Sequence, residues 1–223
     1  MIKMNILVFA PHADDEILGV GGTMAKHIAN GDKVFVCVAT RPYEPIFSKS
    51  LFNVIRNETI KAHDLLGVKK TFFLEFPAVM METVSRYEMN KKISDVIDEV
   101  KPDEVYIPHS GDMQKDHRIL ADAVMVAVRP KNEHKVSRIY AYETLSETEW
   151  NQPCTANAFI PTVYNDISAS LEKKKKAMAC YASQLADFPN PRSLKAVDAL
   201  ARFRGSAILS DAAEAFVLVR EIK

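Results

Sequence analysis

Short runs of apolar residues alternate along the chain with longer segments in which apolar positions recur at helical spacing. Continuous apolar runs are typical of strands buried on both faces of a parallel sheet, and they predict strands over Asn5–Ala10, Lys33–Thr40, Thr71–Phe76, Glu104–Pro108 and Ser137–Glu143. The segments between them predict helices over Asp15–Asn30, Phe52–Leu66, Arg86–Val100 and Asp116–Val128. This alternation predicts an α/β, Rossmann-like fold with a mostly parallel open sheet and helices on both faces.

The sequence after Glu143 has a different character. Residues 145–159 show no regular period, whereas a helix is expected over Ser168–Gln184 and a last strand over Ala215–Arg220. We interpret residues 144–223 as a cap segment with closing elements. Together with an α/β core over residues 1–143, it would form one domain that spans residues 1–223.

Composition narrows the class of protein. The 223 residues include 29 basic and 29 acidic side chains, so no broad basic field is available for nucleic acid or an anionic membrane. The cysteines are odd in number and widely spaced, which indicates free thiols; they are Cys37, Cys154 and Cys180. No apolar stretch approaches the roughly 20 residues of a membrane-spanning helix. Because Met1–Met4 leads directly into the first expected strand, we expect a cytoplasmic protein without a signal peptide.

Two clusters of histidine and aspartate follow predicted strands. The first contains His12 and Asp15, and the second runs from His109 to Asp116 and His117. Right-handed crossovers bring the carboxyl ends of parallel strands to one edge of the sheet, where ligands bind in folds of this kind. Imidazole and carboxylate groups together suit zinc or another first-row metal ion. We therefore predict a metal site assembled from both clusters.

Each cluster has a simpler interpretation when it is taken alone. Asp14-Asp15-Glu16 is compatible with the acidic first turn that many soluble helices carry. His117 is compatible with an exposed histidine at the start of a helix, and His109 with a packed histidine at the end of a strand. The coincidence of two such clusters at strand ends favours a site over these alternatives.

Other notable residues receive structural roles at this stage. Three glycines lack the spacing of a dinucleotide-binding motif and are expected to permit close packing of a helix on the sheet; they are Gly19, Gly21 and Gly22. Three histidines have no acidic partner nearby in the sequence; they are His27, His63 and His134.

The first cluster also has the form of a known motif. Pro11-His12-Ala13-Asp14-Asp15-Glu16 resembles the signature (A/P)-H-P-D-D-E of the PIG-L/LmbE-like zinc deacetylases, and Asp116-His117 matches the second motif of that family. The resemblance extends over nearly the whole chain. It implies a Rossmann-like fold and hydrolysis of N-acetyl groups from amino-sugar derivatives. It further implies that His12, Asp15 and His117 bind zinc and that Asp14 is the general base.

The chain departs from the family pattern at two positions. Ala13 replaces a proline, and Gln114 stands where many members have a histidine that stabilises the tetrahedral intermediate. The oxyanion donor is therefore Gln114, His109 or both, and we favour His109 narrowly because it ends a strand beside the predicted metal site. Asp116 is assigned to the catalytic group as a carboxylate that orients a ring nitrogen of a ligand histidine.

The sequence indicates substrate-binding residues less specifically than metal ligands. Arg56, Arg192 and Arg204 are candidates to hold sugar hydroxyls or a phosphate through their guanidinium groups, although surface salt bridges would account equally well for the last two. The resemblance implies Zn²⁺ as cofactor, with another first-row divalent metal as the alternative. It also implies a small N-acetylated substrate of the amino-sugar class, and it leaves open whether that sugar is free, nucleotide-linked, lipid-linked or an antibiotic precursor. A homo-oligomer is compatible with the sequence.

Two other functions remain open from the sequence alone. One is a metal hydrolase that acts on a non-sugar amide, and the other is a catalytically idle domain that binds a metal ion or a carbohydrate. Asp14 argues against the idle domain, because a purely binding protein does not need a base beside three metal ligands.

Overall fold

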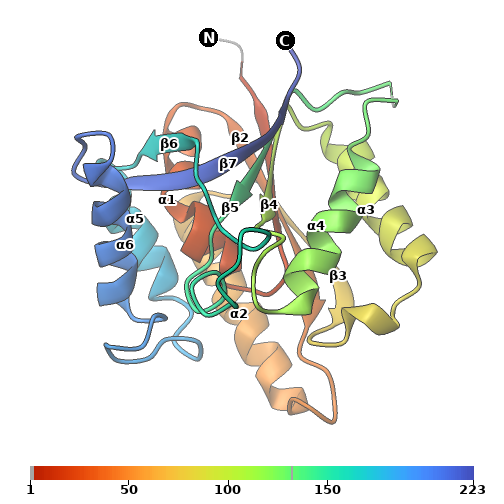
Figure 1. Cartoon of the computed structure of the whole chain (residues 1–223). Helices are drawn as coiled ribbons and strands as arrows, with labels where there is room; N and C mark the ends of the chain where they lie inside the picture. The colour runs from red at the N-terminus through yellow and green to blue at the C-terminus, as the bar shows by residue number, and fades with distance from the viewer. Residues whose placement is uncertain (1–2, 132) are drawn as a thin grey trace.

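The computed structural model describes residues 3–131 and 133–223. Met1 and Ile2, on which the expectation about a signal peptide partly rests, lie outside these residues. Within them, the strands form a single sheet in the order β3-β2-β1-β4-β5-β7-β6, drawn in Figure 1. Strands β1 to β5 are parallel, and β7 is antiparallel to both of its neighbours. The strands are β1 (Asn5–Ala10), β2 (Lys33–Arg41), β3 (Lys70–Pro77), β4 (Glu104–Pro108), β5 (Arg138–Tyr142), β6 (Val163–Asp166) and β7 (Ala213–Glu221).

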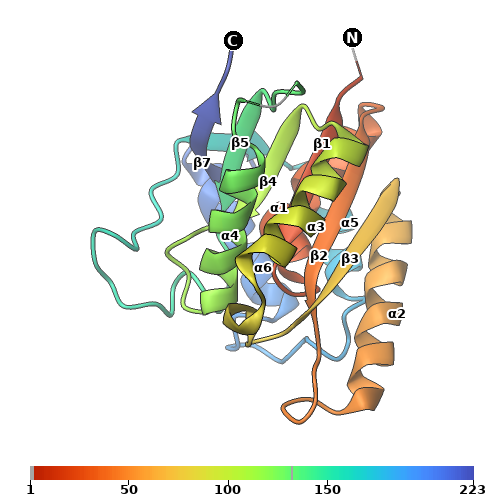
Figure 2. The same cartoon turned by 90° about the vertical axis from the view of Figure 1, so that its right-hand side faces the viewer.

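Helices cover both faces of the sheet, as Figures 1 and 2 show from two directions. One face carries α3 (Arg86–Val100) and α4 (Lys115–Ala127). The other face carries α1 (Asp15–Ala29), α2 (Lys49–Leu66), α5 (Leu171–Met178) and α6 (Leu194–Ser206). A short 3₁₀ helix, η1 (Met81–Thr83), follows β3.

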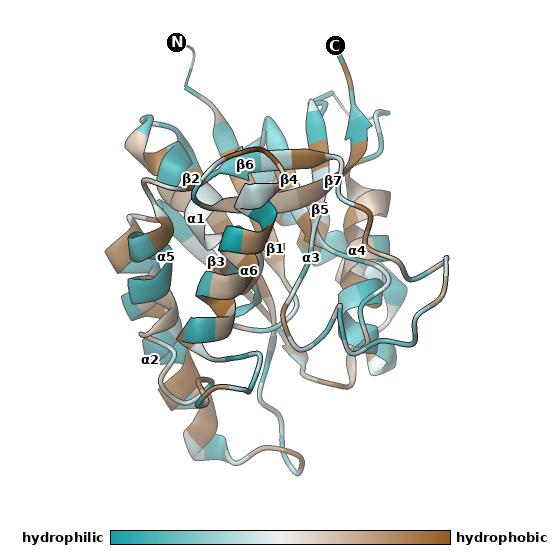
Figure 3. Ribbon diagram, turned by 60° about the vertical axis from the view of Figure 1, so that its left-hand side comes forward, coloured by the Kyte–Doolittle hydropathy of each residue, from teal (hydrophilic) through white to brown (hydrophobic). Residues whose placement is uncertain are grey.

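The alternation of side chains along β1 explains the two layers. Ile6 and Val8 belong to the core cluster under α1, whereas Leu7 and Phe9 belong to the cluster under α3 and α4. Successive residues of a strand point to opposite faces, so a strand that is apolar throughout requires helices on both sides. Figure 3 shows the complementary pattern in α5 and α6, whose outward turns carry hydrophilic residues.

The predicted fold class is confirmed, and each strand and helix expected before Glu143 is present with small shifts at its ends. The C-terminal segment differs from the expectation. The helix expected over Ser168–Gln184 ends at Met178, because the residues after it turn to place Tyr181 against the first cluster, where its hydroxyl donates to Glu16. Strand β6 and helix α6 were not predicted; β6 is short and only partly buried, so it carries no clear alternating pattern.

A buried ion pair ties the C-terminal segment to α1. The Lys174 ammonium lies 2.6 Å from Glu214 Oε1, and both side chains are buried. Glu214 accepts the backbone N–H groups of Gly22 and Thr23 at 2.8 and 2.7 Å, and Lys174 donates to the carbonyl oxygen of Leu18 at 2.7 Å. Elements from the end of the chain therefore fix the middle of the first helix.

Two further expectations concern the chain as a whole. Cys37, Cys154 and Cys180 are all free thiols in the structure. In the described ranges, no helix combines the length and apolarity needed to cross a bilayer.

Gly19 provides a test of the packing between α1 and β5. A Cβ atom at Gly19 would lie 2.2 Å from Cδ2 of Tyr142, whose hydroxyl is fixed by donating to the Phe9 carbonyl oxygen at 2.8 Å. Gly19→Ala should therefore lower the free energy of unfolding by about 1–3 kcal/mol despite the better helix propensity of alanine. Urea unfolding followed by circular dichroism measures this change.

Gly21→Ala in the same helix is the matched control. A Cβ atom there would meet Ile17 Cγ2 at 3.1 Å and Lys174 Cγ at 3.2 Å, contacts that a shift of a few tenths of an ångström relieves, so the change should stay within about 1 kcal/mol. Equal unfolding free energies for the two variants would contradict this description of the interface.

Candidate active site

The site lies where the order of the strands reverses. Strands β1 and β4 are neighbours, with Ile6 opposite Glu104, and the chain proceeds from β1 towards one edge of the sheet and from β4 towards the other. The carboxyl ends of two such strands leave a crevice in which ligands bind. His12 follows β1 and His117 lies in the first turn of α4, so both predicted clusters reach this crevice.

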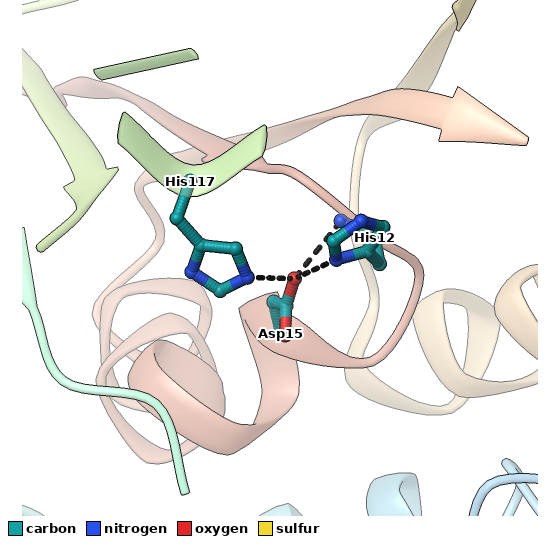
Figure 4. Close-up of side chains that lie close together, drawn as sticks. All are labelled: His12, Asp15 and His117. Atoms are coloured by element: carbon teal, nitrogen blue, oxygen red, sulfur yellow. Dashed lines mark hydrogen bonds and ion pairs between the residues drawn. The ribbon is translucent and has the colours of Figure 1, made fainter. Parts of the chain in front are cut away.

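His12, Asp15 and His117 come together there, as Figure 4 shows. One potential ligand atom from each residue lies within 4.8 Å of the other two. Asp15 Oδ2 is 3.3 Å from His12 Nδ1 and 3.4 Å from His117 Nε2. Asp15 and His117 are completely buried, whereas the His12 side chain is 18% exposed. The simpler interpretation of His117 as an exposed helix-start residue is therefore wrong.

Each histidine is oriented by a second carboxylate. Asp116 Oδ2 lies 3.0 Å from His12 Nε2, which leaves Nδ1 facing Asp15. Asp112 Oδ2 lies 2.8 Å from His117 Nδ1, which leaves Nε2 facing Asp15. A carboxylate on the far nitrogen fixes the orientation of a ring and makes it a better metal ligand. The sequence indicated this role for Asp116, but it did not identify Asp112.

One unpartnered polar atom lies within the group. His117 Nε2, which faces Asp15, is buried and has no hydrogen-bond partner among the described residues. Buried polar atoms normally have partners, so this nitrogen is available to a metal ion. Two imidazoles and a carboxylate fit zinc or a similar divalent ion.

The same contacts change the pKa values of the metal-free site. Burial disfavours the imidazolium, but hydrogen bonds to Asp116 and Asp15 outweigh it and raise the pKa of His12 to about 9. For His117, burial is outweighed by the charge of Asp15 and the hydrogen bond to Asp112, and its pKa rises to about 10. The two histidines in turn hold the pKa of Asp15 well below its usual range, although burial acts in the opposite direction.

Asp14 has an unusual backbone conformation at the start of α1. Its φ angle is 112°, in the left-handed region that a non-glycine residue rarely adopts. Glu16 Oε2 accepts the Asp14 N–H at 3.1 Å, and Glu16 Oε1 contacts the Tyr181 hydroxyl at 2.6 Å and His63 Nε2 at 3.1 Å. This buried network fixes the strained residue in place. His63 thus has an acidic partner, contrary to expectation, because Glu16 is distant in sequence.

The Asp14 carboxyl group is held from one side only. Its Oδ2 accepts from Arg192 Nη1 at 2.8 Å, and Arg192 Nε donates to Ser146 Oγ at 2.9 Å. Its Oδ1 is buried and finds no hydrogen-bond partner in the described part of the chain. Burial raises the pKa of Asp14 above its ordinary range, and the charge of Arg192 opposes that rise. Asp14, Asp15 and Glu16 have no exposed surface, so they are not a solvated acidic turn.

A cavity of about 340 Å³ opens beside this group. Its polar lining includes His12, Gln114, Glu147 and Arg192. Gln114 Oε1 is buried and lacks a hydrogen-bond partner among the residues described, so the amide is available to a ligand. Glu147 is 2% exposed and accepts the Gln114 N–H at 3.1 Å, and burial raises its pKa. Sequence reasoning gave no role to Glu147, because no local pattern distinguishes a buried acid in an irregular loop.

Three sequence candidates do not line this cavity. His109 Nε2 lies 3.0 Å from the Asn157 carbonyl oxygen, so the ring is directed into the 157–159 loop rather than towards the metal ligands. Arg204 forms a two-point ion pair with Glu143, at 2.8 and 2.6 Å. Arg56 is paired with Glu75 on β3 and stacks on neighbouring phenylalanine rings. For both arginines, a carboxylate supplied by the tertiary structure satisfies the guanidinium.

The fold is a Rossmann-like α/β fold, and the site contains a His/Asp/His group that is able to bind a metal ion. Residues 7–128, slightly more than half of the chain, match the PIG-L family, described as GlcNAc-PI de-N-acetylase. The chain belongs to this family. The predicted family and the predicted enzyme class, an N-deacetylase, are thereby confirmed.

Individual proteins are similar to this chain in sequence or in fold. A probable N-acetyl-alpha-D-glucosaminyl L-malate deacetylase 2 from Bacillus anthracis is 26% identical over 193 residues, covering 82% of this chain and 83% of the relative. A conserved protein from Thermus thermophilus shares 27% identity with a TM-score of 0.80, covering 99% of this chain and 96% of the other. N,N'-diacetylchitobiose deacetylase from Pyrococcus horikoshii has the same fold, with 24% identity and a TM-score of 0.76 over 97% and 84% of the two chains.

Metal binding at this site should release protons. The pKa values of His12 and His117 are raised to about 9 and about 10. Because pH 7 is below both values, both rings are protonated in the metal-free protein. A metal ion requires neutral rings, so binding should release close to two protons and the apparent affinity should rise about 100-fold per pH unit between pH 6 and 8. Calorimetric titration of Zn²⁺ in buffers with different ionisation enthalpies counts the protons.

Asp112→Asn provides the comparison. It removes the hydrogen-bonded charge that helps to keep His117 protonated, so fewer protons should be released and the slope of affinity against pH should decrease. A release of fewer than about half a proton by the unaltered protein would contradict the description of the metal-free site.

Proposed function

We propose that this protein is a zinc-dependent hydrolase that removes the N-acetyl group from an amino-sugar derivative, with Asp14 as the general base. The observation that carries the proposal is the buried Asp14 carboxyl group, which has one unpartnered oxygen and immediately precedes Asp15 of the His12, Asp15 and His117 group. The names of relatives that act on N-acetylated sugars support the substrate class.

The three ligand residues would hold the ion in a partly open site. His12, Asp15 and His117 provide three protein ligands, which is the number typical of catalytic rather than structural zinc. When bound, such an ion supplies Lewis-acid polarisation and makes water acidic enough to lose a proton near neutral pH. All other groups of the proposed reaction belong to the protein.

Asp14 would move the proton. Its Oδ2 is held by Arg192 at 2.8 Å, so Oδ1 is the atom free to accept a proton from the attacking water. Once protonated, the same carboxyl group can return the proton to the departing amine. Proton transfer by a positioned group of this kind contributes about 10²–10⁴-fold to the rate. Arg192 is therefore assigned to positioning the base rather than to binding the substrate.

Gln114 would stabilise the developing negative charge. Its amide lines the cavity, whereas the His109 ring is directed away from it. A side-chain amide can donate from its nitrogen to an oxyanion, as other amide side chains do in acyl-transfer enzymes. The structure thus favours Gln114 over His109, the reverse of the preference drawn from the sequence.

The function is tested by acetate release and the base by Asp14→Asn. N-acetylglucosamine, its disaccharide and nucleotide-linked forms should release acetate in the presence of Zn²⁺, and removal of the metal ion with a chelator should abolish the activity. Asp14→Asn should retain the bound metal ion while turnover decreases by about 10²–10⁴-fold. His117→Ala is the contrasting variant, because it should lose both the metal ion and activity. Normal turnover by Asp14→Asn would rule out this base.

The oxyanion donor is tested by a pair of variants. Gln114→Ala should lower kcat by about 10²–10³-fold and leave the shape of the pH profile unchanged, because an amide does not titrate. His109→Ala should retain most of the activity provided that its circular dichroism matches that of the unaltered protein. The assignment fails if steady-state rates across pH show the larger loss, or a changed limb, for His109→Ala.

A further inference from the structure

The cavity beside the proposed metal site has two kinds of lining. The polar lining is formed by residues already described. The apolar lining, here called the apolar wall, comes from the start of α2 with the loop before it, the turn after β3, and the loops around α4 and β5. Its side chains are Phe47, Leu51, Ile55, Val79, Met113 and Trp150. In Figure 1, the start of α2 and the loop after β5 lie at the same end of the molecule.

Part of this apolar wall is exposed to water. Trp150 is 55% exposed, Met113 46% and Val79 40%. Single exposed apolar side chains are ordinary, but a group of them around one concave site marks a surface that binds an apolar ligand. Each of these three side chains reaches the cavity from a different segment, so the wall is a product of the tertiary structure and not of one amphipathic element.

The charges of the cavity do not suit an anionic substituent. Among the described lining residues, Arg192 is the one arginine or lysine, and its guanidinium is already bonded to Asp14 and Ser146. Glu147 adds a buried acid to the same wall. Outside the cavity, Arg41 and Arg56 share the carboxylate of Glu75. A carboxylate on the part of the substrate that contacts the apolar wall would lose hydration without an unpaired lysine or arginine in the cavity lining to receive it, which is unfavourable.

From these observations we infer that the substrate carries a neutral, apolar substituent, an aryl or short alkyl aglycone, which packs against Trp150 and Met113. This inference rests on the proposed function, because it places the N-acetyl group beside the polar lining residues. The cavity volume of about 340 Å³ suits a monosaccharide with a small aglycone, since pockets for small molecules span roughly 300–1,000 Å³. The aglycone thereby differs from the dicarboxylic malate in the name of the Bacillus anthracis relative.

Paired substrates test the inference. Phenyl and L-malyl glycosides of N-acetylglucosamine, in both anomers, are compared with the free sugar by acetate release. The phenyl glycoside should have a kcat/KM at least about tenfold above that of the malyl glycoside. Trp150→Ala should lower the ratio of kcat/KM for the phenyl glycoside to that for the free sugar by about tenfold. Met113→Arg, which supplies the missing cation, should raise kcat/KM for the malyl glycoside.

A control variant and a fluorescence measurement separate an effect on aglycone binding from an effect on turnover. Tyr87 is 79% exposed on α3 and does not line this cavity, so Tyr87→Ala should leave all three substrates unchanged. Trp150 is the single tryptophan of the chain, so its fluorescence reports binding at the apolar wall without any turnover.

Equal or better use of the malyl glycoside would overturn the inference and leave the proposed function intact. Absence of acetate release from every sugar would instead count against the proposed function. In that case the fluorescence titration still decides the inference, because tighter binding of the phenyl glycoside supports it and equal or tighter binding of the malyl glycoside refutes it.

Discussion

Three consecutive carboxyl groups without any exposed surface constrain the rest of this structure. Asp14, Asp15 and Glu16 follow β1 directly and are completely buried. A buried carboxylate is costly unless it is paired and hydrogen-bonded, so each requires a partner from elsewhere in the chain. Those partners are Arg192 for the first, His12 and His117 for the second, and Tyr181 with His63 for the third. The site is the place where four residues distant in sequence, together with His12 of the same turn, compensate three buried acids.

This requirement explains why the end of the chain is integrated with its beginning. Strand β7 enters the sheet beside β5, and Lys174 and Glu214 contact the backbone in the middle of α1. Arg192 then reaches the Asp14 carboxylate from the loop before α6. The segment after Glu143 therefore helps to determine the chemistry of residues near the N-terminus. A substitution that loosened this segment would change the positions and pKa values of the proposed catalytic residues, although none of those residues would itself be substituted.

The cavity combines two kinds of lining. Its polar residues include groups fixed by ion pairs and hydrogen bonds, whereas its apolar side chains come from irregular loops and the start of α2. Loops tolerate change more readily than the elements that they connect, so one set of reacting groups can serve different substrates when the walls change. In such a fold, the reaction and the substrate depend on the residues of the site and of the cavity lining, and not on the sheet that supports them.

The sequence by itself determined the sheet of the first 143 residues, because a strand buried on both faces must be apolar throughout and that pattern is local. It also placed His12, Asp15 and His117 at one edge, because parallel strands end together. The tertiary structure alone decided which groups face the cavity. Asp112, Glu147 and Trp150 have no distinguishing local pattern, and the strand-end position of His109 did not reveal that its ring is directed towards Asn157. Such contacts depend on loops that pack only after the sheet has formed, and no periodicity records them.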